Sequence, residues 1–291
     1  MENTSKDVLS TIAMNLDLPT ILRWCESNSR INRNVCQNND VWRNKLAKDF
    51  PNEYRDFHSF NLSLSLRETY FFLYQLSYIK KLLNTNESLY DIFLKEKLDL
   101  SGKGLQKVPA FVLPNLQYLD LSHNKLIEVP AFHLPNLKKL YLSTNKLNKI
   151  PAFNLPNLQY LYLDNNQLAE IPVFDLPNLQ YLYLNVNKLS EVPSFDLPNL
   201  RVLFLPYNKL SKVPSFDLPN LQELSLPYNQ LVEIPAFNLP KLQELSLDSN
   251  QLTKIPAFDL PNLRKLYLEN NKLTESSKKQ LKDKYGNKVI I

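Results

Sequence analysis

The chain has 291 residues, 44% hydrophobic and 22% charged, so it is long enough for about two domains at roughly 150 residues each and too apolar for wholesale disorder. Its net charge of +5 is local, because the six lysines and two acidic residues between Lys272 and Ile291 supply +4 of it, which argues against a basic nucleic-acid-binding face. Three glycines exclude a Walker A loop or a GxGxxG fingerprint, and no uncharged apolar run approaches the roughly 18 residues of a membrane span.

Residues 1–58 are predicted to form a small helical domain. Apolar residues recur at helical spacing in three successive segments. These are Val8, Leu9, Ile12 and Leu16; Ile21, Leu22 and Cys25; and Ile31, Val35 and Cys36. We expect a break at Asp17–Pro19, between the first two segments. The two cysteines are predicted to be buried structural thiols, because their neighbours are apolar and no general base is paired with either in the sequence.

A resemblance to the F-box family covers about 45 residues of this region. It rests on the pattern VLxxIxxxLDLPxIL, the polar segment SNSRINRNV and the closing DVW, with Thr4 and Ser5 in place of the usual opening Leu-Pro. The region is most similar to F-boxes encoded by large (giant) DNA viruses. The resemblance implies binding to a Skp-type adaptor and, through it, to a cullin-RING (SCF-type) ubiquitin ligase. The implied adaptor-binding residues, or residues that hold the helices in place, are Leu9, Ile12, Leu16, Leu18, Pro19, Leu22 and Trp42.

Residues 59–96 are predicted to be a helical linker and N-terminal cap. Apolar residues from Tyr70 to Leu83 follow an amphipathic helical pattern, and a second helix is expected from Ser88. Because two faces of the first helix carry apolar groups, we expect it to be wedged between two modules.

Residues 97–275 repeat with a period of 21. The motif LPNL begins at Leu113 and recurs in register, once as LPKL, and Asn124 and Phe111 each begin a column that recurs with it. Read as LxxLxLxxNxLxxIPxFxLPN, the unit resembles the leucine-rich repeat. About nine units are expected, the first of them irregular, with Lys103 at the asparagine position.

The repeat predicts an α/β solenoid with a curved parallel sheet. The xLxL segment is a short strand whose leucines point to one side, and one unit cannot bury them without a stacked neighbour. The asparagine is expected to bond backbone groups that the turn leaves unpaired. Residues 276–291 are predicted to cap the stack with a helix that Thr274 caps and Gly286 ends, followed by a last strand.

The residues beside the strand leucines are expected to face the concave surface, and there they predict a target-binding site. Aromatic side chains occupy five consecutive units and two acidic ones follow. These residues are Tyr118, Tyr141, Tyr160, Tyr162, Tyr181, Tyr183, Phe204, Glu223 and Glu244. Contiguous exposed aromatics are typical of a protein-docking surface. The alternative is that tyrosine, a good strand former, was copied as the repeats duplicated.

Together, the resemblance and the repeat indicate a substrate-recognition subunit of an SCF-type ligase, with the target on the concave face. The alternative is a binding scaffold, unconnected with ubiquitin, whose N-terminal helices only cap the solenoid. No nucleophile, metal or phosphate-binding constellation is present, so we expect no enzyme activity, cofactor or metal. We expect no nucleic-acid or membrane partner and a cytoplasmic location, in the host cytoplasm or nucleus if the protein is viral.

Overall fold

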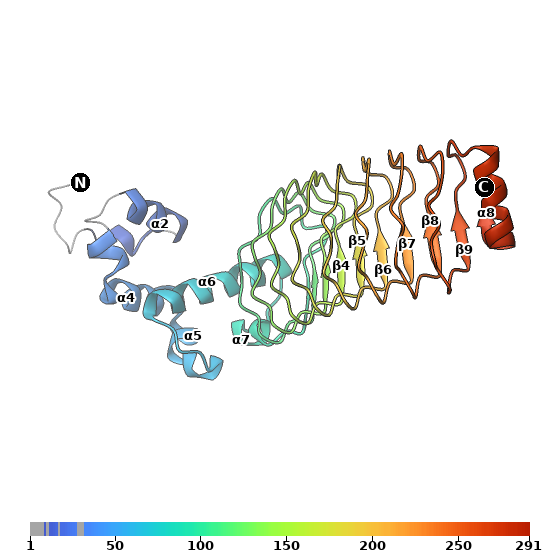
Figure 1. Cartoon of the computed structure of the whole chain (residues 1–291). Helices are drawn as coiled ribbons and strands as arrows, with labels where there is room; N and C mark the ends of the chain where they lie inside the picture. Colours follow the sequence, from blue (N-terminus) through green and yellow to red (C-terminus); the bar gives the residue numbers. More distant parts are fainter. Residues whose placement is uncertain (1–8, 10–11, 17, 28–31) are drawn as a thin grey trace. The chain divides into compact units, whose positions relative to one another are not determined.

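The computed structural model describes residues 9, 12–16, 18–27 and 32–291 of the chain. These residues form two compact units, divided between Leu94 and Lys95. Figure 1 shows helices in the first unit and stacked turns in the second. Of the segment predicted as linker and cap, residues 59–94 belong to the first unit and residues 95 and 96 to the second. Within the described residues, no helix is long and apolar enough to cross a membrane.

The first unit is helical, as predicted. Its elements are α2 (Leu18–Ser27), the π-helix η1 (Asn32–Cys36), α4 (Asn39–Asp49), α5 (Pro51–Arg55), the 3-10 helix η2 (Phe57–Phe60), α6 (Leu66–Leu83) and α7 (Leu89–Phe93). Ser65 and Ser88 form capping boxes that start α6 and α7. The predicted break between the first two segments is present as a turn over residues 14–16, but it does not include Leu18 and Pro19, where α2 begins, because proline fits the first turn of a helix. The predictions for Val8, Asp17 and Ile31 lie outside the described residues.

Aromatic side chains build the core of this unit. Trp42 is 1% exposed, lies 5.5 Å from the ring of Tyr70, and donates an Nε1 hydrogen bond of 3.0 Å to the carbonyl of Cys36. Phe60 contacts Phe72 edge to face at 5.4 Å. These contacts join α4 to α6 and η2 to α6. The core of the unit therefore contains side chains from both the predicted helical domain (residues 1–58) and the predicted linker (residues 59–96).

The two cysteines differ from the prediction. Both are buried, as expected, but Cys25 at the end of α2 and Cys36 in η1 form a disulfide instead of two thiols. Their Cα atoms are 6.2 Å apart, within the range of about 4.4–6.8 Å that a disulfide spans. The chain returns from α2 to η1 within eleven residues, and the sequence alone did not indicate that this return faces one cysteine toward the other.

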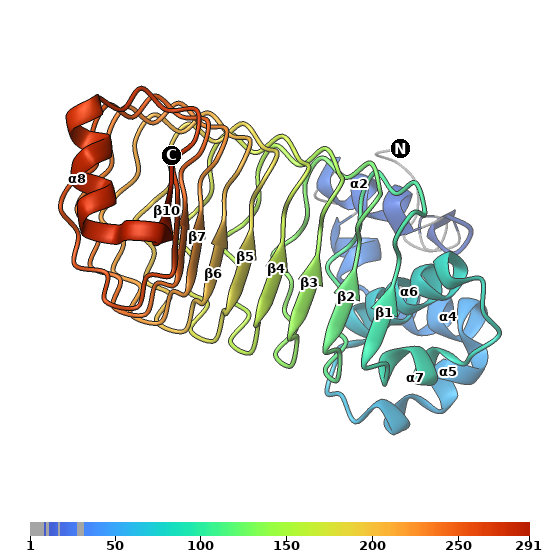
Figure 2. The ribbon, with the colours of Figure 1, turned by 90° about the vertical axis from the view of Figure 1, so that its right-hand side faces the viewer.

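The second unit is the predicted solenoid. Ten strands form one parallel sheet in chain order, each paired with the next (Figure 2). They are β1 (Lys97–Asp99), β2 (Tyr118–Asp120), β3 (Lys139–Tyr141), β4 (Tyr160–Tyr162), β5 (Tyr181–Tyr183), β6 (Val202–Phe204), β7 (Glu223–Ser225), β8 (Glu244–Ser246), β9 (Lys265–Tyr267) and β10 (Val289–Ile290). The leucine at the centre of each strand from β1 to β9 is buried, so the leucine core runs the length of the stack.

The asparagine column is a buried hydrogen-bond ladder, as predicted. Asn187 is representative: its Oδ1 accepts the Leu168 N–H at 3.0 Å, and its Nδ2 donates to the carbonyls of Leu163 and Leu184 at 3.0 and 3.1 Å. Each asparagine thus joins its own turn to the preceding repeat. The phenylalanine column is also buried, and Phe195 and Phe216 stack with 6.2 Å between ring centres.

A second asparagine ladder, which the sequence reasoning missed, lies in the LPN turn. The exposed Asn178 donates to the carbonyl of Pro156 at 2.8 Å, and Asn136, Asn157 and Asn199 make the same bond in their repeats. At the C-terminal end, α8 (Glu275–Tyr285) begins at the Thr274 cap, as predicted, and β10 adds the last strand.

Candidate protein-binding face

The concave face is built by the two residues that flank each buried strand leucine. In β2 to β6 both flanking positions are half-buried, whereas the leucine between them is fully buried. In-register parallel pairing then places equivalent residues of successive repeats side by side. All nine predicted target-binding residues lie on this face, in two columns.

The aromatic residues of the two columns form stacks. In the first column, Tyr162 lies between Tyr141 and Tyr183, with ring centres 4.5 and 4.6 Å apart and planes within 7° of parallel. In the second column, Tyr160 and Tyr181 stack at 4.6 Å and 2°. Offset or parallel stacking at this distance is favourable and holds the rings in fixed positions. The structure therefore offers a rigid aromatic surface, which costs little side-chain entropy when a partner binds.

Lysines extend the second column toward the N-terminal end of the sheet. The Nζ of Lys97 lies 4.7 Å from the centre of the Tyr118 ring, and the Nζ of Lys139 lies 4.8 Å from that of Tyr160. Both distances are within the range of cation–π attraction. The sequence analysis did not predict these contacts, which the cross-strand alternation of lysine and tyrosine would have indicated.

Burial changes the titration of the tyrosines. Desolvation, reinforced by the neighbouring Asp120, raises the pKa of Tyr118 to about 12. Desolvation, reinforced by Tyr141 and Tyr183, raises the pKa of Tyr162 to about 12 as well. The hydroxyl groups are therefore neutral over the whole physiological range, and that of Tyr118 donates to Asp120 Oδ2 at 3.2 Å.

The acidic residues follow the aromatic ones as predicted. Glu223 and Glu244 are paired in register on β7 and β8. Burial raises the pKa of Glu223, and the charge of Glu244 raises it further. The C-terminal half of the face therefore carries two adjacent carboxylates in partly desolvated surroundings, which favours contact with a positively charged group.

A second aromatic pair lies at the edge of this face and was missed by the sequence reasoning. Tyr207 and Tyr228 stack at 4.4 Å, and they are 53% and 50% exposed. Each stands directly before a ladder asparagine and has a positive φ, of 55° and 53°. Val186, at the equivalent position one repeat earlier, is 42% exposed. Tabulating the residue before each ladder asparagine would have revealed this apolar run.

The predicted adaptor-binding residues divide into two groups. Leu9, Leu18 and Trp42 are buried, so they hold the helical unit together and are not available for direct contact with a partner. Ile12 and Pro19 are exposed. The remaining two, Leu16 and Leu22, are half-buried.

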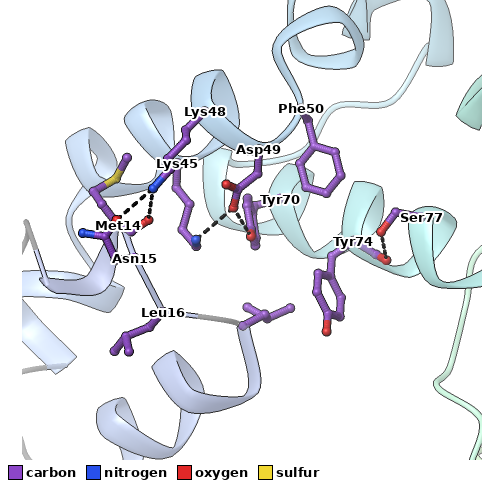
Figure 3. Close-up of a pocket in the computed structure, with 11 residues that line it drawn as sticks. Met14, Asn15, Leu16, Lys45, Lys48, Asp49, Phe50, Tyr70, Tyr74 and Ser77 are labelled. Atoms are coloured by element: carbon purple, nitrogen blue, oxygen red, sulfur yellow. Dashed lines mark hydrogen bonds and ion pairs between the residues drawn. The ribbon is translucent and has the colours of Figure 1, made fainter. Parts of the chain in front are cut away.

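A cavity of about 360 Å³ lies in the same unit, lined by Leu16 and Leu18 from one side and by α4 and α6 from the other (Figure 3). At its wall, Lys48 donates to Asn15 Oδ1 at 2.9 Å, and Tyr70 donates to Asp49 at 2.6 Å. These polar groups satisfy one another, so the arrangement stabilises the unit and defines no chemistry of its own.

The sequence matches a family model described as Leucine Rich repeats (2 copies). The matches overlap in succession over residues 114–155, 135–176, 156–197, 177–218, 198–239, 219–259 and 240–281. They cover more than half of the chain, which therefore belongs to the leucine-rich repeat family.

Among solved structures, the chain is similar to YopM, a leucine-rich effector protein from Yersinia pestis, with 29% identity and a TM-score of 0.53. The similar region covers 62% of this chain and 56% of the YopM chain, so the chain spans little more than half of that protein. Comparison with curated proteins gives no match.

Proposed function

We propose that this chain is a non-catalytic receptor that binds a target protein with its concave face. The observation that carries the proposal is the stack of Tyr141, Tyr162 and Tyr183, continued by Phe204, across four consecutive strands. Rigid, partly exposed aromatic rings are the residues in which binding energy concentrates at protein interfaces. Membership of the leucine-rich repeat family supports protein binding in the same way, since such solenoids present extended concave surfaces.

The target-binding part of the proposal is tested by proximity labelling in cells with the full chain. We compare the wild type with the triple variant Tyr162→Ala, Tyr183→Ala and Phe204→Ala, and with the control Tyr207→Ala, Tyr228→Ala at the edge of the face. Each central truncation is expected to cost about 2 kcal/mol of binding free energy. Proteins labelled by the wild type and the control but lost from the triple variant are the expected targets. An unchanged set in the triple variant would mean that the concave rings are only strand filler.

We further propose that the helical unit recruits a Skp-type adaptor and, through it, a cullin-RING ubiquitin ligase. The F-box resemblance, which covers about 45 residues of this unit, supports this, as do the exposed side chains of Ile12 and Pro19. The chain then carries out no chemistry but raises the effective concentration of its target near the ubiquitin-conjugating enzyme. It would act in the cytoplasm, or in the cytoplasm or nucleus of a host cell if a virus encodes it.

A binding scaffold without a ligase is the second candidate, and one observation favours it. Leu9, Leu18 and Trp42 are used within the unit's own core, which leaves fewer apolar groups for an adaptor. Co-purification of the full chain with a Skp-type adaptor separates the two. If the chain is a ligase receptor, the adaptor should co-purify with the wild type and with the control Val173→Glu, which alters an exposed residue of the solenoid. It should be lost from Ile12→Glu. If the chain is a scaffold without a ligase, the adaptor should co-purify with neither the wild type nor the two variants.

A further inference from the structure

We propose that the concave face contains a pocket for one arginine side chain of the target protein, between β6 and β9. The inference rests on the proposed function, because it takes the concave face as the docking site. It adds a specific chemical requirement, which is a guanidinium group placed beside the aromatic stack.

The pocket arises from a gap in the aromatic column. The column that contains Tyr162 and Phe204 continues with Ser225 and Ser246, and it becomes aromatic again at Tyr267. A cavity of about 250 Å³ occupies this gap, with Phe204 and Tyr267 at its ends and the two serines lining it. Because Phe204 and Tyr267 are three strands apart, their backbones are separated by about 14 Å, and two ring positions between them are empty.

Carboxylates line the same cavity and make it negative. Glu223 and Glu244 lie side by side, and no ion pair to either is present among the described residues. Asp248 also lines the cavity, but its oxygens are engaged: Oδ2 accepts from Ser246 Oγ and Oδ1 from the Glu269 N–H, both at 2.9 Å.

The cation paired in register with these carboxylates, Lys265, offsets their charge only in part: Tyr267 has the larger effect in raising the pKa of Lys265, and the charge of Glu244 raises it further. Lys265 is paired in register with Glu244, but it is exposed, does not line the cavity, and places its Nζ 5.9 Å from the centre of the Tyr267 ring. Glu223 lies one strand further away. The cavity therefore keeps an excess of negative charge that a ligand can neutralise.

The Ser225 hydroxyl also favours a ligand in the cavity. Ser225 is only 5% exposed and lines the cavity, and no hydrogen bond of its hydroxyl is present among the described residues. No fully buried side-chain nitrogen or oxygen of these residues lacks a partner, so this hydroxyl is open to the cavity, where a ligand can reach it. A ligand with several N–H groups would bond this hydroxyl and a carboxylate together.

Arginine fits these features better than other cations. Its planar guanidinium stacks on an aromatic face such as that of Phe204 and donates paired hydrogen bonds to a carboxylate. The same face already holds the cations of Lys97 and Lys139 over tyrosine rings. The volume is below the roughly 300–1,000 Å³ of small-molecule sites, and the described residues contain no cluster suited to a metal ion.

The test is an NMR titration of the full chain with N-acetylarginine amide, following the backbone amides of Leu224 and Ser225. N-acetylcitrulline amide, a neutral analogue of similar shape, and N-acetyllysine amide are titrated in parallel. Two variants address the pocket: Glu223→Gln with Glu244→Gln removes its charge, and Ser225→Tyr fills the gap with the residue found at four equivalent positions. The matched control, Ser249→Tyr, adds a tyrosine outside the cavity at a position where Tyr207 and Tyr228 already stand in other repeats.

We expect saturable binding of the arginine amide with a dissociation constant on the order of 1 mM. Binding should weaken at least tenfold in the Gln pair, disappear in Ser225→Tyr, persist in Ser249→Tyr, and be absent for citrulline and weaker for lysine. Equal binding of citrulline or lysine, or wild-type binding by Ser225→Tyr, would overturn the pocket. Since the titration uses no target protein, its failure leaves the labelling experiment as an independent test of the proposed function.

Discussion

The asparagine ladder gives a stability prediction that can be worked out from its geometry. In Asn187→Ala, the Leu168 N–H loses its acceptor and the carbonyls of Leu163 and Leu184 each lose a donor, at sites that are buried. At about 1 kcal/mol for each hydrogen bond, the three losses amount to about 3 kcal/mol of unfolding free energy.

The matched control for this prediction stands in the same repeat. Asn178→Ala removes one exposed bond of 2.8 Å, to the Pro156 carbonyl, and should cost less than about 1 kcal/mol. Urea unfolding followed by circular dichroism measures both variants, and hydrogen exchange of the Leu168 amide provides a local readout. The reasoning is refuted if Asn187→Ala costs no more than Asn178→Ala, or if the Leu168 amide exchanges at the wild-type rate.

Three further predictions concern single positions. Val186 has a φ of 55°, a conformation that β-branched residues adopt only at a cost, so Val186→Asn should raise the unfolding free energy by about 1 kcal/mol in the same urea assay, and an unchanged value would contradict this. Tyr118 and Tyr162 keep their protons up to about pH 12 in the folded state but lose them near pH 10 when unfolded, so stability should fall as pH rises between these values. Spectrophotometric titration should show phenolate forming near pH 12, and full ionisation near pH 10 in the folded chain would refute the burial argument. Phe216→Ala should cost about 3–5 kcal/mol in thermal or urea unfolding, because the ring is 2% exposed, and a loss below about 1 kcal/mol would mean that the column is not a packed core.

The repeat was predictable because its physics is local and repeated. Each strand needs a leucine on the buried side and each turn needs an asparagine to bond its backbone, so the same types recur every 21 residues. The aromatic columns follow from this register, and Tyr162 and Tyr183 stack where the alternation of the strand places them. The placement of the first column therefore follows from the same periodicity that identified the strands.

Features that depend on unequal neighbours were not predictable in this way. The disulfide between Cys25 and Cys36 depends on the path between two helices that share no repeat. The exposed pair of Tyr207 and Tyr228 lies at a position whose residue type varies among the repeats, so no regular column indicated it. The pocket beside Ser225 lies where the aromatic column is interrupted by serine, and it can be recognised only once the surrounding side chains are placed in the structure.

The central claim is that the concave aromatic face binds a protein, and site-specific photocrosslinking tests it most directly. The photoreactive residue p-benzoylphenylalanine replaces Tyr162 at the middle of the stack, or Val173, which is 62% exposed and lies outside the concave face. The account predicts a discrete crosslinked partner from position 162, absent from position 173 and lost when Tyr183→Ala and Phe204→Ala are added. The same partners from both positions, or a crosslink that survives these two substitutions, would contradict it.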